Sequence, residues 1–502
     1  MSPPPLVYRL LRGLVRALMG VFFREIAVEG VANVPRDRGG LLVAWHPNGI
    51  VDPALILASA PVQVVFGARH GLLRWPVLGA LMRGLGTVPI YRAQDAAGDP
   101  AARRAANDRS LGALADAVAG GRFAALFPEG VSHDAPFLSE VKTGAARLFL
   151  RAQAQVAERG GPPPAVVPVG LHYDRKSLWR SDVVVAFHPP LDVSDLDRAK
   201  ARDARLAVAA GETDGVPAGS ASRPDDEPDP AHVLTDRIER ALVEAVRPTD
   251  DWETHRLMHR AYALMRAEDE VREGVRAGPV SARDRARGFH MVWHGYQARR
   301  HTHPDEVAAL RRDVGDYDRL LRAAGLSDAD LDRNPRLSPL LGVIFAVQLA
   351  LVAVLLPPVL VLGFAVNGPP FALLNLAARR FARAEKDTAT VKILGGVVLY
   401  PLAWLAAGVA AGLAAARLHA LFPGLPDAPG AAGVAVFVLS AVGGALALRW
   451  GELTREGWRA VRVRLFRRQR RDVVARLQLM RTGLYDRFDA LRAGLRLPDG
   501  VV

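Results

Sequence analysis

Residues 41–53 read Leu-Leu-Val-Ala-Trp-His-Pro-Asn-Gly-Ile-Val-Asp-Pro. The apolar run at 41–45 predicts a buried strand, and the Pro-Asn-Gly that follows His46 predicts a turn. On a continuous helix, residues six apart point about 240° away from one another. His46 and Asp52 can therefore meet only where the backbone bends, and this turn makes such a pair possible.

A histidine beside a carboxylate is the arrangement of a general base and the group that orients it. A neutral imidazole accepts a proton from a hydroxyl only if its other nitrogen is held protonated and turned away, which a hydrogen-bonded carboxylate achieves. Asp52 is the nearest candidate for that role. Taken alone, a histidine near an aspartate is more often a capped, solvated or core residue than a catalytic one. Other segments of the sequence must therefore decide between these roles.

Three further apolar runs, at 62–66, 123–127 and 166–171, predict strands with helical stretches between them. Strands that alternate with helices predict an α/β fold, a mixed sheet flanked by helices. Ligands bind beyond the carboxyl ends of strands in such folds. His46, Glu129 and His172 each follow or end a predicted strand.

Residues 1–24 predict an amphipathic helix, because arginines interrupt its apolar residues, unlike in a signal peptide. It suits a membrane interface, and packing onto its own domain is the alternative. We place the α/β domain at 25–207, a disordered linker rich in Gly, Pro, Ser, Asp and Glu at 208–231, and a helical region at 232–336. His290 and His294 in that region lack the accompanying carboxylate motif of a metal site, and we predict no metal.

A membrane region is predicted at 337–449, with apolar stretches at 339–366, 393–416 and 431–448 near or above the ~20 residues that cross a bilayer. Pro357-Pro358 favours a bent or re-entrant first stretch. Both the segment around Arg379 to Lys392 and the helical tail 450–502 are basic, so the positive-inside rule favours two crossings at 393–416 and 431–448, with the catalytic domain on the cytoplasmic face. Three crossings stay an alternative.

The charge and the cysteine content of the chain limit the kinds of partner and chemistry that we expect for it. The 502-residue chain carries a net charge of +13, which suits nucleic acid or an anionic membrane surface. Because the basic tail directly follows an apolar run of bilayer length, we expect membrane lipid and no nucleic acid. The chain contains no cysteine, which excludes disulfides, thiolate metal sites and a cysteinyl acyl-enzyme.

Further motifs follow the His46 block. Residues 86–92 end in Arg92, whose planar fork suits a phosphate. Residues 127–134 read Phe-Pro-Glu-Gly-Val-Ser-His-Asp, so that Glu129 and Gly130 follow a strand end, where a glycine permits close approach of a polar ligand. Lys142 and the run Val-Val-Pro-Val-Gly-Leu at 166–171 complete the set.

In this order, the motifs resemble the PlsC-like glycerolipid acyltransferase family, whose members transfer a fatty acyl group from a thioester to a glycerol-type hydroxyl. The resemblance covers roughly residues 25–195. It implies that His46 is the general base, that Asp52 orients it, that Arg92 binds the acceptor phosphate, and that Glu129 and Gly130 shape the acceptor pocket. We also predict that Asn48 is a substrate-binding residue.

Two features depart from the usual family pattern. Five residues separate His46 from Asp52 instead of four, as in a branch that includes fungal acyltransferases acting on glycerol 3-phosphate and dihydroxyacetone phosphate. Ser132 stands where the wider family usually has an arginine that would bind phosphate. We predict that His133 or Lys142 replaces that arginine, because both lie close to Ser132 in the sequence.

The sequence therefore predicts an integral membrane O-acyltransferase of phospholipid biosynthesis. Its acyl donor is expected to be acyl-CoA or acyl-carrier protein, its acceptor glycerol 3-phosphate or lysophosphatidate, and it needs no cofactor. Other lysophospholipids or dihydroxyacetone phosphate are alternative acceptors. A protein of a different class, a membrane-anchored lipid-binding or scaffold protein without turnover, is the second interpretation.

Overall fold

The computed structural model describes residues 4–90, 100–196, 229–274, 280–332, 357–382 and 384–495. The chain forms two compact units. The α/β unit is built chiefly from Met1–His255 and Ser281–His290, and the helical unit from Arg256–Val280 and Met291–Leu497. Arg92, most of the predicted linker and the first part of the apolar stretch 339–366 lie outside the described residues.

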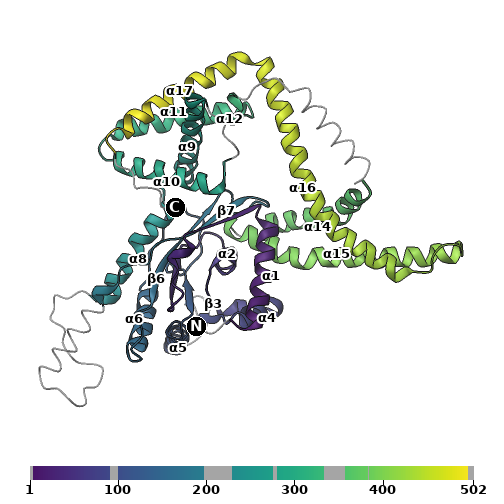
Figure 1. Cartoon of the computed structure of the whole chain (residues 1–502), viewed down its shortest axis with the longest axis horizontal. Coiled ribbons are helices and arrows are strands. Elements are labelled where there is room, and N and C mark those ends of the chain that lie inside the picture. Colours follow the sequence, from purple (N-terminus) through teal and green to yellow (C-terminus); the bar gives the residue numbers. More distant parts are fainter. Residues whose placement is uncertain are drawn as a thin grey trace, which may run out of the picture. The chain divides into compact units, whose positions relative to one another are not determined.

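A seven-stranded mixed sheet forms the centre of the α/β unit (Figure 1). Its order is β1-β7-β6-β2-β5-β3-β4, and β6 and β7 are the antiparallel pair, whereas the other neighbours run parallel. The strands are β1 (Glu25–Glu29), β2 (Gly40–Ala44), β3 (Val64–Arg69), β4 (Val88–Ile90), β5 (Phe123–Leu126), β6 (Ala165–Tyr173) and β7 (Asp182–Phe187). The predicted α/β fold with a mixed sheet is confirmed.

The four predicted apolar runs correspond to β2, β3, β5 and β6. Every residue of β2 is buried, as expected for a central parallel strand that is covered on both faces. Sequence analysis did not identify β1, β4 or β7.

Helices cover both faces of this sheet (Figure 1). Their bounds are α1 (Leu6–Phe22), α2 (Val51–Ser59), α3 (His70–Leu73), α4 (Pro76–Gly84), α5 (Pro100–Ala119), α6 (Gly144–Ala157) and α8 (Pro230–Val246), with a short 3-10 helix at Val31–Asn33. Side chains of α5, α6 and α8 share one core with Leu41 and Val43 of β2. We had assigned α8 to a separate helical region, but its Leu234 and Ile238 pack in the sheet core.

The N-terminal helix α1 has two different apolar faces. Its side chains Tyr8, Val15, Met19 and Phe22 are buried, and the Tyr8 hydroxyl accepts from the backbone N–H of Val64 at 2.9 Å. Five other apolar side chains are more than half exposed: Leu6, Val7, Leu10, Leu14 and Val21. The helix thus packs onto its own domain and also presents an apolar surface to its surroundings.

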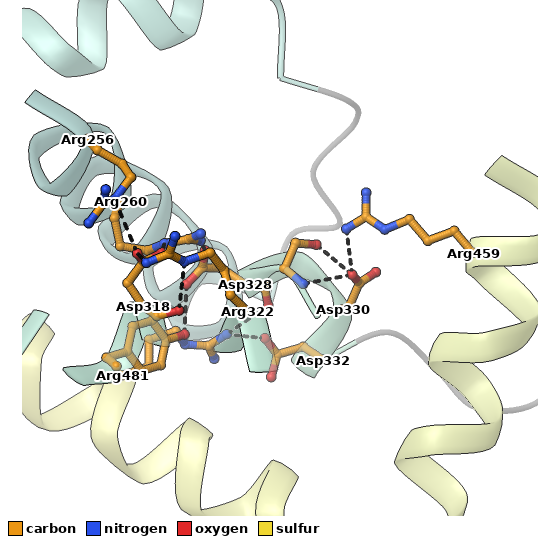
Figure 2. A network of polar contacts seen from close by, with 11 residues as sticks. Arg256, Arg260, Asp318, Arg322, Asp328, Asp330, Asp332, Arg459 and Arg481 are labelled. Atoms are coloured by element: carbon orange, nitrogen blue, oxygen red, sulfur yellow. Dashed lines mark hydrogen bonds and ion pairs between the residues drawn. The ribbon is translucent and has the colours of Figure 1, made fainter. Parts of the chain in front are cut away.

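The helical unit contains several helices, most of which share an apolar core. They are α9 (Trp252–Glu273), α10 (Ala282–Arg299), α11 (Pro304–Ala323), α12 (Asp328–Leu331) and α17 (Arg471–Arg492), of which α9 and α10 begin in the α/β unit. Leu264, Tyr317, Leu321 and Leu477 are among the core side chains. Beside them lies a network of ion pairs in which Arg260 binds both Asp318 and Asp328 (Figure 2).

Three helices of this unit are long and apolar enough to cross a membrane, judged by length and composition: Val359–Phe381, Glu385–Leu421 and Pro429–Gln469. They belong to α14 (Pro357–Phe381), α15 (Glu385–Leu421) and α16 (Pro429–Gln469), which pack against one another (Figure 1). Helix α14 continues through Pro369 and Pro370 to Phe381, beyond the end that we predicted for the first apolar stretch. The number of crossings stays a prediction.

Candidate active site

The carboxyl ends of the parallel strands β6, β2 and β5 lie side by side, because β2 pairs with both neighbours. His46 lies two residues beyond β2, Glu129 three beyond β5, and Tyr173 ends β6. The sheet therefore gathers these side chains at one edge, as the sequence predicted for His46 and Glu129. Ligands bind at this edge in α/β folds.

His46 and Asp52 form a hydrogen-bonded pair. The distance from His46 Nδ1 to Asp52 Oδ2 is 2.8 Å. Asp52 lies in the first turn of α2, and Gly49 has a φ of +42° in the turn before it, a conformation that glycine adopts without a steric penalty. The predicted meeting of the two side chains across a bent backbone is confirmed.

The two side chains of this pair are buried to different extents. The Asp52 side chain is fully buried, whereas the His46 side chain is 14% exposed. The imidazole stacks on Phe127, with ring centroids 4.1 Å apart and planes inclined by 14°. Because Asp52 occupies Nδ1, Nε2 is the nitrogen available to a substrate, and the stacked ring holds it in a fixed plane.

Asp52 has two further donors. The backbone N–H of Asn48 donates to Oδ2 at 2.7 Å, and the Tyr173 hydroxyl donates to Oδ1. Burial, followed by the charge of Asp52, raises the pKa of Tyr173 well above its usual value of 10. Tyr173 thus stays protonated and donates over the whole physiological pH range. Three donors fix the carboxylate that orients His46.

Glu129 holds the backbone of the base in place. Its Oε1 accepts from the His46 backbone N–H at 3.2 Å, and its Oε2 accepts from the Ser139 N–H at 2.8 Å and also contacts His133 Nε2. The residue is almost completely buried. Both oxygens therefore bind protein groups in this structure, and the role of Glu129 in the acceptor pocket stays a prediction.

Asn48 joins the turn after His46 to another segment of the chain through its side chain. Its side chain is fully buried, and its Nδ2 donates to the backbone carbonyl of Lys176 at 3.0 Å. Asn48 thus ties the turn between His46 and Asp52 to the segment after β6. The substrate contact predicted for Asn48 stays a prediction.

His133 and Lys142, the predicted substitutes for a phosphate-binding arginine, have different surroundings. His133 is bound to Glu129 through Nε2, its Nδ1 is buried, and its backbone N–H donates to the His46 carbonyl at 3.1 Å. Both ring nitrogens are therefore turned toward the protein, although the side chain is 15% exposed, and substrate binding by His133 stays a prediction.

Lys142 is exposed and extends over Gly130. A Cβ atom on Gly130 would lie 3.2 Å from Lys142 Nζ, and Gly130 has a φ of +73°. Both facts favour glycine at this position. The arrangement leaves an ammonium group beside the loop that also carries Glu129, where a negatively charged acceptor could bind.

Sequence analysis missed the contributions of Tyr173 and Lys176. Their partners lie 121 and 129 residues away along the chain, so no local motif indicated them. Within the described residues, no group of three or more His, Cys, Asp or Glu side chains is arranged to hold a metal ion. That no metal or cofactor takes part remains a prediction.

The arrangement is suited to proton transfer from a hydroxyl. Nε2 of His46 can accept the proton while Asp52 stabilises the resulting imidazolium. The buried Glu129, Asn48 and Tyr173 determine where that nitrogen points. The α/β unit thus holds the His46 imidazole in a fixed orientation at this edge of its sheet.

Comparisons with known proteins place the site residues within a segment that resembles acyltransferases. Residues 25–172 match the family model described as Acyltransferase. An uncharacterized acyltransferase of Schizosaccharomyces pombe is 25% identical over 286 residues, which are 40% of this chain and 42% of that protein. Glycerol-3-phosphate O-acyltransferase 2 of Saccharomyces cerevisiae is 43% identical over 68 residues, 14% of this chain and 9% of that protein. The chain thus spans less than half the length of either relative.

A solved structure, the 1-acyl-sn-glycerophosphate acyltransferase PlsC from Thermotoga maritima, aligns with a TM-score of 0.28 and 20% identity, over 41% of this chain and 79% of that one. The class of domain follows from the family match. Residues 25–172 match the Acyltransferase family model, and His46, Asp52, Glu129 and Gly130 all lie within this match.

Proposed function

We propose that this protein is a membrane-bound O-acyltransferase. It transfers a fatty acyl group from an acyl thioester, acyl-CoA or acyl-carrier protein, to a hydroxyl of glycerol 3-phosphate or lysophosphatidate. The observation that carries the proposal is the His46–Asp52 pair, in which Nδ1 is bound at 2.8 Å and Nε2 is left for the acceptor.

In the proposed reaction, His46 Nε2 takes the proton of the acceptor hydroxyl as its oxygen attacks the thioester carbonyl carbon. A carbon–oxygen bond forms, the carbon–sulfur bond breaks, and the imidazolium returns its proton to the departing thiolate. No oxidant, reductant or acyl-enzyme is needed, and the chain has no cysteine to form a thioester. A base of this kind contributes about 10²–10⁴-fold to the rate.

The acceptor phosphate would bind near Lys142 and Arg92. Lys142 is exposed and lies over Gly130. Arg92 follows the end of β4 by two residues, outside the described part of the chain. For both, replacement by Ala should raise the KM for a phosphorylated acceptor more than the KM for the acyl donor. An equal effect on both substrates would contradict the phosphate role.

Membrane residence is supported by two features. Helices α14, α15 and α16 are long and apolar enough to span a bilayer. On α1, the exposed leucines 6, 10 and 14 recur every four residues, so they share one helical face that can enter a lipid interface. A product that remains in the bilayer gives the enzyme a reason to work at its surface.

The decisive experiment is an acceptor panel. Full-length protein in lipid nanodiscs is supplied with labelled acyl-CoA and, separately, glycerol 3-phosphate, dihydroxyacetone phosphate, lysophosphatidate and an unphosphorylated lysolipid. Transfer to a phosphorylated acceptor is expected. No transfer to any acceptor, from acyl-CoA or acyl-carrier protein, would favour a non-catalytic lipid-binding or scaffold protein.

The orientation can be tested in the same chain because it has no native cysteine. Single cysteines are introduced at Ala382, at Asp427 and at Gln469, and then labelled with a membrane-impermeant maleimide from either side. We expect Ala382 and Gln469 on the cytoplasmic side and Asp427 on the other. Labelling of Ala382 and Gln469 from opposite sides would contradict two crossings by α15 and α16.

A further inference from the structure

Lys176, in the segment between β6 and β7, is a buried lysine that joins three parts of the α/β unit. Its side chain is 7% exposed. Nζ donates to the Pro47 carbonyl at 3.1 Å and to Asp134 Oδ1 at 2.6 Å, and it lies 5.4 Å from the centre of the Trp252 ring. Lysine is almost never buried without a partner, so these contacts define what holds it there.

The backbone of Lys176 contacts the same turn. Its carbonyl accepts from Asn48 Nδ2 at 3.0 Å, while its ammonium binds the carbonyl of the preceding Pro47. Asn48 in turn donates its backbone N–H to Asp52. One residue therefore holds two consecutive residues of the turn that separates His46 from Asp52.

The connection between α8 and α9, together with the first residue of α9, supports the loop that carries Asp134, the second partner of Lys176. Trp252 Nε1 donates to the Asp134 carbonyl at 2.6 Å, and the Thr249 backbone N–H donates to the Pro136 carbonyl at 2.9 Å. The loop after β5 is thus fixed beside the lysine. Lys176 and Trp252 both lie beyond residues 25–172, the segment that the family model matches.

We propose that Lys176 is a positioning residue that fixes the His46–Asp52 turn, and that Trp252 covers its ammonium group and braces Asp134. This inference rests on the proposed function for its effect on catalysis. Misplacement of a catalytic group by about 1 Å can cost roughly 10²-fold in rate. Without Nζ, the Pro47 carbonyl loses its donor and the turn gains freedom.

The test separates positioning from neutralisation of Asp134. Lys176→Met removes the ammonium, whereas Lys176→Met combined with Asp134→Asn also removes the charge left behind. We expect Lys176→Met to lower kcat about 10- to 100-fold, with the acceptor KM changed less than about threefold. The double variant should regain thermal stability but keep the low kcat, because Pro47 still lacks its donor.

Arg237→Met is the matched control. It breaks the more exposed Arg237–Asp195 ion pair of the same unit and should leave kcat unchanged. A kcat of Lys176→Met within threefold of the wild type would overturn the inference. Recovery of both stability and kcat in the double variant would also overturn it, since Lys176 would then act only by neutralising Asp134. So would a double variant that fails to fold.

Hydrogen exchange provides a readout that does not depend on activity. Lys176→Met and the double variant should speed amide exchange in a peptide covering residues 45–53, whereas Arg237→Met should not. If the wild type transfers no acyl group, the proposed function fails and exchange alone decides the positioning role. Unchanged exchange at 45–53 in both Lys176 variants would refute that role.

Discussion

We compare two clusters of buried charge among the described residues, one around His46 in the α/β unit and one around Asp318 and Asp328 in the helical unit. In the second, every carboxylate meets a guanidinium: Asp318 binds Arg260 at 2.8 Å and Asp328 binds the same arginine at 2.6 Å. Figure 2 shows how the arginines surround these carboxylates. Both clusters contain buried, well-paired charges.

The partners distinguish the two clusters. Within the described residues, Asp52 and Glu129 are bound by histidine, tyrosine and backbone N–H groups, with no guanidinium among the partners. Histidine exchanges its proton near neutral pH, whereas arginine stays charged. The first cluster can therefore move a proton, and the second can only hold helices together. Buried charge by itself does not mark a catalytic site.

Replacing His46 by Ala should have the largest effect, because it removes the group that accepts the proton. We expect acyl transfer to fall by about 10²–10⁴-fold, with the thermal unfolding midpoint close to that of the wild type. Initial rates with labelled acyl-CoA and scanning fluorimetry measure the two quantities. His301→Ala, at an exposed histidine of the helical unit, is the control, and equal losses in both variants would contradict the assignment.

Replacing Arg481 by Met should do the opposite and destabilise the helical unit without changing the rate per folded molecule. Arg481 is 2% exposed and binds Glu268 at 2.9 Å and Asp332 at 2.5 Å. Removing one partner of a buried ion pair costs about 3–5 kcal/mol. The free energy of unfolding is measured by denaturant titration of the detergent-solubilised protein.

The control for Arg481 is Arg487→Met, which breaks an exposed pair with Asp313. Exposed pairs contribute about 0–1 kcal/mol, so this variant should unfold almost like the wild type. A lower transfer rate in folded Arg481→Met would show that the arginine cluster takes part in activity and would remove the distinction between the clusters.

How far the sequence could predict this structure depends on how local each signal is. Four strands lie on continuous apolar runs that can be recognised without knowledge of the rest of the chain, so the sequence predicts them: β2, β3, β5 and β6. Strand β4 has three residues, including Pro89, and β1 is a charged edge strand, Glu-Ile-Ala-Val-Glu. These two lack a strong local pattern. Strand β7 contains an apolar run at 183–187 and could have been predicted.

The same reasoning applies to the site. The pair of His46 and Asp52 lies within one turn, and its geometry followed from Pro47-Asn48-Gly49. The roles of Tyr173 and Lys176 depend on strand β6 lying beside β2, which places them next to residues more than 120 positions earlier. Asn48 and His133 lie near His46, but their hydrogen-bond partners Lys176 and Glu129 come from other segments of the chain, so these contacts are a tertiary property.

Tyr173→Phe should have a smaller effect than His46→Ala, because it removes one donor of three from Asp52. A hydrogen bond to a charged group contributes about 1.5–3 kcal/mol, and we expect kcat to fall about 10-fold. The pKa of Tyr173 is raised well above 10, so its hydroxyl stays protonated and donates to Asp52 at every pH up to 10. The wild-type rate should therefore show no loss from ionisation of Tyr173 up to pH 10. A loss above pH 9 that Tyr173→Phe abolishes would contradict this role.

The smallest effect is expected at Asn367, in the apolar helices, where this polar side chain joins three helices. Asn367 Nδ2 donates to the Ser440 carbonyl at 2.9 Å, and its Oδ1 accepts from Trp404 Nε1 at 2.8 Å, so it links α14, α15 and α16. Interhelical hydrogen bonds in membranes contribute about 0.6–2 kcal/mol. Asn367→Leu should lower the free energy of unfolding in an SDS titration by that amount.

Asn375 provides a matched control for this last substitution, because it donates to Phe371 O within its own helix. Asn375→Leu should leave the titration unchanged. If the two variants behave alike, close packing of glycines such as Gly363 on Gly443 holds the helices together without help from Asn367. In that case the arginine cluster would stabilise the helical unit, whereas the hydrogen bonds of Asn367 would not. Only the arginine cluster could then be contrasted with the His46 site as a purely structural set of polar groups.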